Sequence, residues 1–163
     1  MTSTAATKKA TTHTTTKAQD ATALLKADHQ KVSELFEQYE KARSNSKKKD
    51  LVTQICNELT VHAQIEEEIF YPAVKKASKD TELVPEALVE HATLKDLIDQ
   101  VKDVEPDGEI FEARITVLSE YVKHHVKEEE SEMFAKAKAS KLDMIKLGEE
   151  LASRKDELMA SLT

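Results

Sequence analysis

Four segments of the chain carry apolar residues at the spacing of one face of an α-helix, and a histidine interrupts each face. The faces are Leu25, His29, Val32, Phe36 and Tyr39; Leu51, Ile55, Leu59, His62, Glu66 and Phe70; Val84, Leu88, His91, Leu94, Ile98 and Val101; and Phe111, Ile115, Leu118, Val122, His125, Glu129 and Met133. A weaker fifth face contains Leu142, Leu147, Leu151 and Leu158. Such stripes become buried when helices pack together, so the sequence predicts an all-α fold.

Composition and breaker residues agree with helices joined by short loops. The chain has 163 residues, enough for one domain, with two glycines, three prolines and 4% aromatic residues. A sandwich, a barrel or a glycine-rich nucleotide-binding fold would use more of these residues in its turns. We expect the second helix to kink or end near Pro72, and Pro85 to lie in the first turn of the third. An up-down four-helix bundle with an additional C-terminal helix fits best.

The two halves of the chain repeat the same pattern at an offset of 62 or 63 residues, which predicts a duplicated helical hairpin. The matched pairs are Asp28 and Glu90, His29 and His91, Val32 and Leu94, Leu35 and Leu97, Ile55 and Leu118, Leu59 and Val122, His62 and His125, and Glu66 and Glu129. We expect a disordered Thr- and Lys-rich tail over 1–19, the bundle over 20–139 and the C-terminal helix over 140–163.

Charge and cysteine content bear on partners and location. A net charge of −7 would repel a nucleic-acid backbone, so we expect no nucleic-acid partner. The chain has no apolar run long enough to span a membrane, no secretory apolar stretch at its start, and a single cysteine, Cys56. These features predict a cytoplasmic protein without a membrane partner. The weak C-terminal helix offers a surface for weak self-association.

The polar residues inside the apolar faces predict a metal site. A carboxylate buried without a partner loses its hydration, so two carboxylates and four imidazoles directed into one bundle interior favour bound cations. Residues four apart share a helix face, so His62 can act with Glu66, and His125 with Glu129. His124 has the same spacing from Glu128, but it lies off the apolar stripe that His125 continues. Imidazole suits iron, zinc, copper and nickel, and a carboxylate can bridge two ions.

Other interpretations of these residues remain open at this point. Buried histidine–glutamate pairs without metal, or chance in a chain rich in glutamate, would give parts of the same pattern. The acidic runs 66–68 and 128–130 are expected to be mainly solvated faces with one member of each turned inward. Cys56 is expected to be a small buried residue, and Lys95 to extend to solvent or pair with an acid.

The order of these elements resembles the hemerythrin-like HHE cation-binding family over about residues 20–138. The resemblance is carried by Ala27-Asp28-His29, by His62-Ala-Gln-Ile-Glu66 followed by Glu-Glu-Ile-Phe-Tyr-Pro72, by His91, and by His125-Val-Lys-Glu-Glu129. It implies a non-haem di-iron centre with an oxo or hydroxo bridge, with zinc or manganese as alternatives. The ligands it implies are His29, His62, Glu66, His91, His125 and Glu129.

One departure from the family bears on function. Oxygen-carrying hemerythrins have a further ligand histidine one turn after the third-helix histidine, where this chain has Lys95. His124 or a tyrosine is a candidate replacement. We therefore expect a protein that binds or senses dioxygen, nitric oxide or peroxide in an oxygen or redox-stress response. A catalase-like peroxide-decomposing enzyme and a structural zinc bundle are the alternatives.

Overall fold

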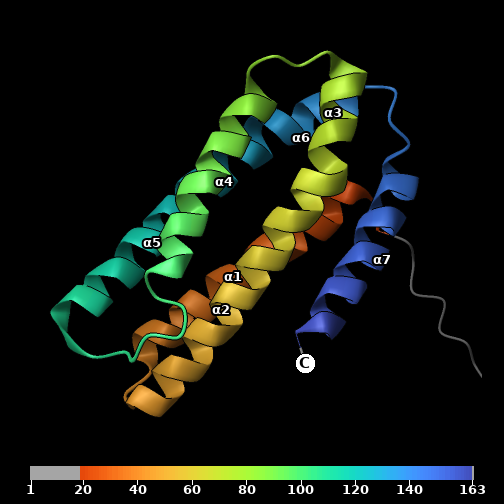
Figure 1. Ribbon diagram of the computed structural model, residues 1–163. Helices are drawn as coiled ribbons and strands as arrows, with labels where there is room; N and C mark the ends of the chain where they lie inside the picture. Colours follow the sequence, from red (N-terminus) through yellow and green to blue (C-terminus); the bar gives the residue numbers. More distant parts are fainter. Residues whose placement is uncertain (1–18, 163) are drawn as a thin grey trace, which may run out of the picture.

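The computed structural model describes residues 19–162, which form five continuous helices (Figure 1). They are α1 (Ala21–Lys41); α2 (Asn45–Ile65) continued by a π-helical turn η1 (Glu66–Phe70) and α3 (Tyr71–Ser78); α4 (Leu83–Asp99); α5 (Gly108–Glu128) continued by η2 (Glu129–Met133) and α6 (Phe134–Ala139); and α7 (Met144–Ser161). Within 19–162 there is no β-strand, so the predicted all-α fold is confirmed.

Side-chain caps define where several helices begin. Asp20, Ser44 and Asp143 each accept a hydrogen bond from the backbone amide three residues later, at the starts of α1, α2 and α7. Asp80 accepts bonds from two backbone amides at the start of α4. These bonds satisfy amide groups that have no partner within the first helical turn. Gly108 begins α5 with a φ of 86°, a conformation that favours glycine.

Every position of the four strong apolar faces is buried except Leu88, whereas Leu142 and Leu158 of the weaker fifth face are only partly buried. Leu88 is 42% exposed, and the buried positions of α4 step through Val84, Ala87, His91 and Leu94 instead. The step of three and then four residues places Ala87 on the buried face and Leu88 beside it. Cys56 is buried, as expected.

Two apolar clusters lie along the bundle, and the histidines of the predicted site lie between them in sequence on α1, α2, α4 and α5. One cluster gathers residues such as Phe36, Ile55 and Leu118. The other gathers residues such as Leu25, Phe70 and Phe134 near the end formed by α3 and α6. A polar group held between two apolar layers is shielded from water, which strengthens its electrostatic interactions.

The helix that contains Pro72 continues past this residue, so the expectation that it would end near Pro72 is wrong. It passes through the π-helical turn η1 and continues as α3 to Ser78. Proline is not the cause of the π turn, because η2 in the second half has the same geometry and no proline. The shared feature is a buried glutamate at the first position of each turn, Glu66 and Glu129.

The fifth helix packs against the first hairpin. α7 contacts α1 and α2 and buries Leu147, Gly148 and Leu151. A β-carbon at Gly148 would lie 2.1 Å from the carbonyl oxygen of Gln19, so only glycine permits this approach. Self-association through α7 remains a prediction.

No helix in the described part of the chain is long and apolar enough to cross a membrane. The predicted tail falls almost wholly within 1–18, outside the described residues.

Candidate metal centre

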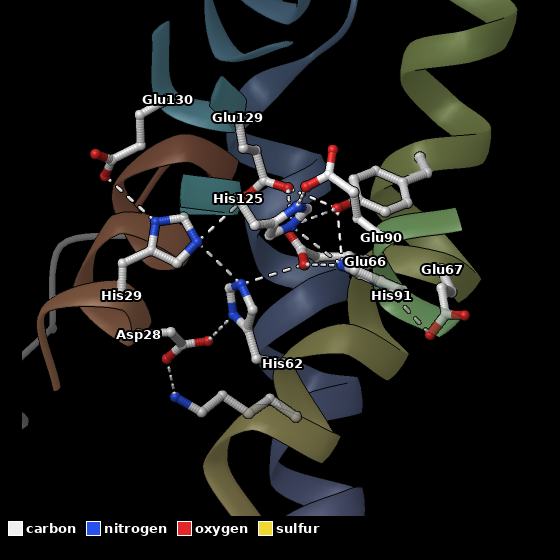
Figure 2. A network of polar contacts seen from close by, with 12 residues as sticks. Asp28, His29, His62, Glu66, Glu67, Glu90, His91, His125, Glu129 and Glu130 are labelled. Carbon is white, nitrogen blue, oxygen red and sulfur yellow. Dashed lines mark hydrogen bonds and ion pairs between the residues drawn. The ribbon is translucent and has the colours of Figure 1, made fainter. Parts of the chain in front are cut away.

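The structure brings the six predicted residues together in the middle of the bundle (Figure 2). All six are buried, and Glu66 is 0% exposed. Their ligand atoms form two groups, one of His29, His62, Glu66 and Glu129, the other of Glu66, His91 and His125. Each group draws its histidines from one pair of helices, α1 with α2 and α4 with α5. The duplicated hairpin therefore supplies two similar halves of one site.

In the first half, two imidazoles face each other beside the two carboxylates. The Nε2 atoms of His29 and His62 are 3.0 Å apart. His62 Nε2 lies 3.2 Å from Glu66 Oε1, and His29 Nε2 lies 3.3 Å from Glu129 Oε1. Phe134 stacks on the His29 ring, with centroids 6.0 Å apart.

The second half repeats this arrangement with one added group. The Nε2 atoms of His91 and His125 are 3.3 Å apart. His91 Nε2 is 3.3 Å from Glu66 Oε1, and His125 Nε2 is 3.5 Å from Glu129 Oε2. The hydroxyl of Tyr71 lies 3.1 Å from His91 Nε2 and donates a hydrogen bond of 2.6 Å to Glu129 Oε2. The two glutamates thus lie between the halves, and Glu129 directs one oxygen to each.

The sequence pattern did not single out Tyr71 as a residue of the site, and the π-helical turn explains why. In a regular helix Tyr71 would lie about 100° away from the stripe that ends at Phe70. In the structure the Tyr71 amide donates to the carbonyl of Glu66, five residues earlier, and both aromatic residues are buried. The residue that matches Tyr71 in the second sequence repeat is Phe134. The repeat itself therefore indicates that the two halves of the site differ at this position.

A carboxylate lies behind each of the four histidines, on the Nδ1 side of its ring. Asp28 lies 3.0 Å from His62, Glu90 2.9 Å from His125, Glu130 3.3 Å from His29, and Glu67 3.6 Å from His91. Such partners fix ring orientation and leave Nε2 free to bind a metal. The acidic runs therefore each direct two members toward the site, whereas the sequence analysis expected one.

The donor set fits cations, on two observations. Two ligands at right angles on one ion, with metal–nitrogen bonds of about 2.1 Å, lie about 3.0 Å apart, and tetrahedral ligands about 3.4 Å apart. The His29–His62 and His91–His125 separations of 3.0 and 3.3 Å fall within this range. In addition, both oxygens of Glu66 and one of Glu129 are buried without a hydrogen-bond partner among residues 19–162. Buried anionic oxygens without donors favour a positive ion beside them.

When metal is absent, protons on the histidines can balance the negative charge of the buried carboxylates. Burial lowers the pKa of His62, but Glu66 and Asp28 outweigh burial and hold that pKa well above its ordinary value. Burial likewise opposes protonation of His125, and Glu129 raises its pKa to about 9. Burial favours the neutral form of Glu129, yet His125 and His29 hold its pKa well below the usual range. The raised pKa values of His62 and His125 favour a proton on one histidine of each pair, and such a proton can lie between the two facing Nε2 atoms.

Two other sequence expectations concern residues near the site. His124 lies outside the cluster, with its side chain 62% exposed and paired with Glu128. Lys95 forms a 2.7 Å ion pair with Glu67, so the expectation that it would pair with an acid is confirmed. Beside His91 and His125, the residue placed to act as a fifth donor is therefore Tyr71 of α3.

A small void adjoins the four imidazole rings. Its volume is about 20 Å³, and its apolar walls include Val32, Leu59, Leu94 and Val122. A void of this size holds about one water-sized molecule.

Comparison with known proteins identifies the family. Residues 20–137 match the hemerythrin HHE cation binding domain. The chain belongs to this family. A crystal structure of an HHE cation binding domain-containing protein from Mycobacterium kansasii has the same fold, with a TM-score of 0.77 and 24% identity over 88% of this HHE domain chain and 89% of that chain.

A curated relative extends well beyond the HHE domain. A protein of Nostoc sp. (strain PCC 7120 / SAG 25.82 / UTEX 2576) named DNA nickase is 34% identical over 114 residues. These residues are 69% of this chain and 32% of that protein, so the chain spans about a third of the relative's length.

The buried histidine and glutamate clusters of this HHE domain are consistent with a metal site.

Proposed function

We propose that this HHE domain holds two non-haem iron ions at His29, His62, Glu66, His91, His125 and Glu129. The pair would bind or sense a small oxygen or nitrogen ligand: dioxygen, nitric oxide or hydrogen peroxide. The observation that carries the proposal is the convergence of two imidazole pairs on two shared, buried carboxylates. When bound, an iron pair supplies redox-active ions with exchangeable coordination positions.

The residues of the chain would prepare this site in three ways. Asp28, Glu90 and Glu130, which lie within hydrogen-bond distance of histidine Nδ1 atoms, would hold those Nδ1 protons so that the Nε2 lone pairs point inward. Glu66 and Glu129 neutralise positive charge between the halves. The hydroxyl of Tyr71 holds one oxygen of Glu129 and is itself within reach of the second half.

The size of the void favours binding of a small ligand over other chemistry. About 20 Å³ beside the imidazole rings accepts one water-sized molecule, and its apolar walls disfavour charged or bulky ones. Dioxygen and nitric oxide meet this limit. Hydrogen peroxide also fits, so peroxide decomposition is kept as the alternative activity.

Metal analysis after iron-replete expression tests the proposal. We expect two irons per chain, with loss of iron in His62→Ala and Glu129→Ala because each removes a donor and leaves its neighbours unsatisfied. Oxygen, nitric oxide and peroxide are then mixed separately with the reduced protein, and the spectrum and oxygen release are followed. Stoichiometric zinc without iron would support the structural alternative instead. Sustained oxygen release from peroxide would favour the enzyme.

DNA cleavage is not part of the proposal. The name of the Nostoc relative describes a protein of which this chain matches about a third. The net charge of −7 also disfavours contact with a phosphate backbone.

A further inference from the structure

The two halves of the site differ on their outer sides, although their inner residues match. On the outer side of His91, Lys95 forms a 2.7 Å ion pair with Glu67, which lies beside the ring. The residue matched with Lys95 is Ser33, and the residue matched with Glu67 is Glu130. Glu130 lies beside His29 as Glu67 lies beside His91, but the short side chain of Ser33 does not form the corresponding ion pair.

A cavity lies beside Ser33. It lies between α1 and α5, has a volume of about 450 Å³, and is lined by residues that include His29, Ser33, Phe36 and Glu130. Ser119 of α5 also lines it, whereas the matched Cys56 of α2 is buried in an apolar cluster. Position 33 thus has a shorter side chain than position 95, and Ser119 lines a cavity where Cys56 packs into an apolar cluster.

The cavity adjoins the small void beside the imidazoles. Both are bounded by His29, Val122 and Val126. Val122 is buried and Val126 is partly buried, so these two side chains of α5 form the partition between the outer cavity and the void. Side chains of this kind change rotamer or shift on fast timescales, which lets a small molecule pass between two adjacent cavities.

We propose that the cavity between α1 and α5 is the access route for external ligands, and that it leads them past Val122 and Val126 to the His29–His62 half of the site. The Lys95–Glu67 ion pair lies on the matched side. Tyr71 adds a hydroxyl to the His91–His125 half, while the apolar ring of Phe134 is in its place on the His29 side. This inference rests on the proposed function.

The route selects ligands by size and charge. Its inner end admits one water-sized molecule, and its lining includes apolar Phe36, Val122 and Val126. Lys123 and Lys127 are exposed and one helical turn apart on α5, so they favour small uncharged or anionic molecules over cations at the opening.

Nitric oxide binding to the diferrous protein tests the route by stopped-flow absorbance, because this ligand is small and uncharged. Val126→Phe narrows the partition, and Ser33→Lys copies the residue of the matched side, so both should slow association several-fold. Val126→Ala should accelerate it. Lys95→Ala removes the ion pair on the matched side, which is not part of the route, and should leave the rate near that of the wild type. Val117→Phe is the control for added bulk, because Val117 lies on the same helix, is 49% exposed and does not line the cavity.

A second measurement avoids iron chemistry. Xenon occupies apolar cavities, so ¹²⁹Xe NMR of the zinc-loaded protein should report binding that Val126→Phe and Ser33→Lys weaken and Val117→Phe does not. Faster nitric oxide binding in Lys95→Ala, with unchanged rates in Val126→Phe and Ser33→Lys, would overturn the proposed route. Wild-type protein that takes up no iron would refute the proposed function instead, and absence of xenon binding would then also remove the cavity as a route.

Discussion

Raising the pH should destabilise the metal-free protein, because protons on buried histidines replace the missing cations. Glu129 raises the pKa of His125 from an ordinary value of 6.5 to about 9 in the folded state. A folded-state pKa above the unfolded one means that the stabilisation is complete below pH 6.5. It is lost as the pH rises through about 9.

The magnitude follows from the size of this shift. A shift from 6.5 to about 9 corresponds to roughly 3 kcal/mol of unfolding free energy. The lowered pKa of Glu129 describes the same interaction and is counted once. The pKa of His62 is also raised, by Glu66 and Asp28 acting against burial, so the total loss should be at least of this order.

Urea unfolding of chelator-treated protein, followed by circular dichroism at about pH 6 and about pH 9.5, measures the loss. The His125→Gln variant should show a weaker pH dependence. Zinc-loaded protein should behave oppositely between mildly acidic and neutral pH, since metal and protons compete for the same nitrogen atoms. If the unfolding free energy of the metal-free protein stays constant or rises with pH, the proposed protonation of these pairs is wrong.

Four further substitutions separate the roles of individual residues. His125→Ala should lose bound iron, whereas His124→Ala should retain it in elemental analysis; equal losses would contradict the geometry. Tyr71→Phe removes the donor to Glu129 and should lower the metal-free unfolding free energy by about 1–3 kcal/mol, measured with urea; an unchanged value would show that the bond is dispensable. Lys155→Met removes the α7 partner of Asp28, and chelator competition should show metal affinity reduced by about 10- to 100-fold; wild-type affinity would exclude this support.

Local periodicity was sufficient to predict most of the bundle. An apolar side chain at every third or fourth position can be buried only on a helix, so the stripes through His29 and His125 predicted which histidine faces inward. The same argument separated His125 from the exposed His124. It failed at Leu88, where both Ala87 and Leu88 are apolar and the sequence alone does not show which one is buried.

The outer partners of the histidines depend on contacts between helices. Asp28 is adjacent to His29 in sequence, yet it contacts His62 on the next helix. Glu130 contacts His29, which is 101 positions away. Acidic runs look like solvated surface in a sequence, and only the packing of one hairpin on the other determines which members reach the site.

The sequence by itself determined the helices, their buried faces and the six candidate ligands, because each of these follows from spacing along one helix. Only the tertiary structure decided how the two halves differ. The π-helical turns rotate Tyr71 and Phe134 into the interior, Lys95 forms an ion pair on one side, and Ser33 lines a cavity on the other. These differences depend on residues from separate helices meeting in space, and a one-dimensional pattern does not contain the distances between helices that bring them together.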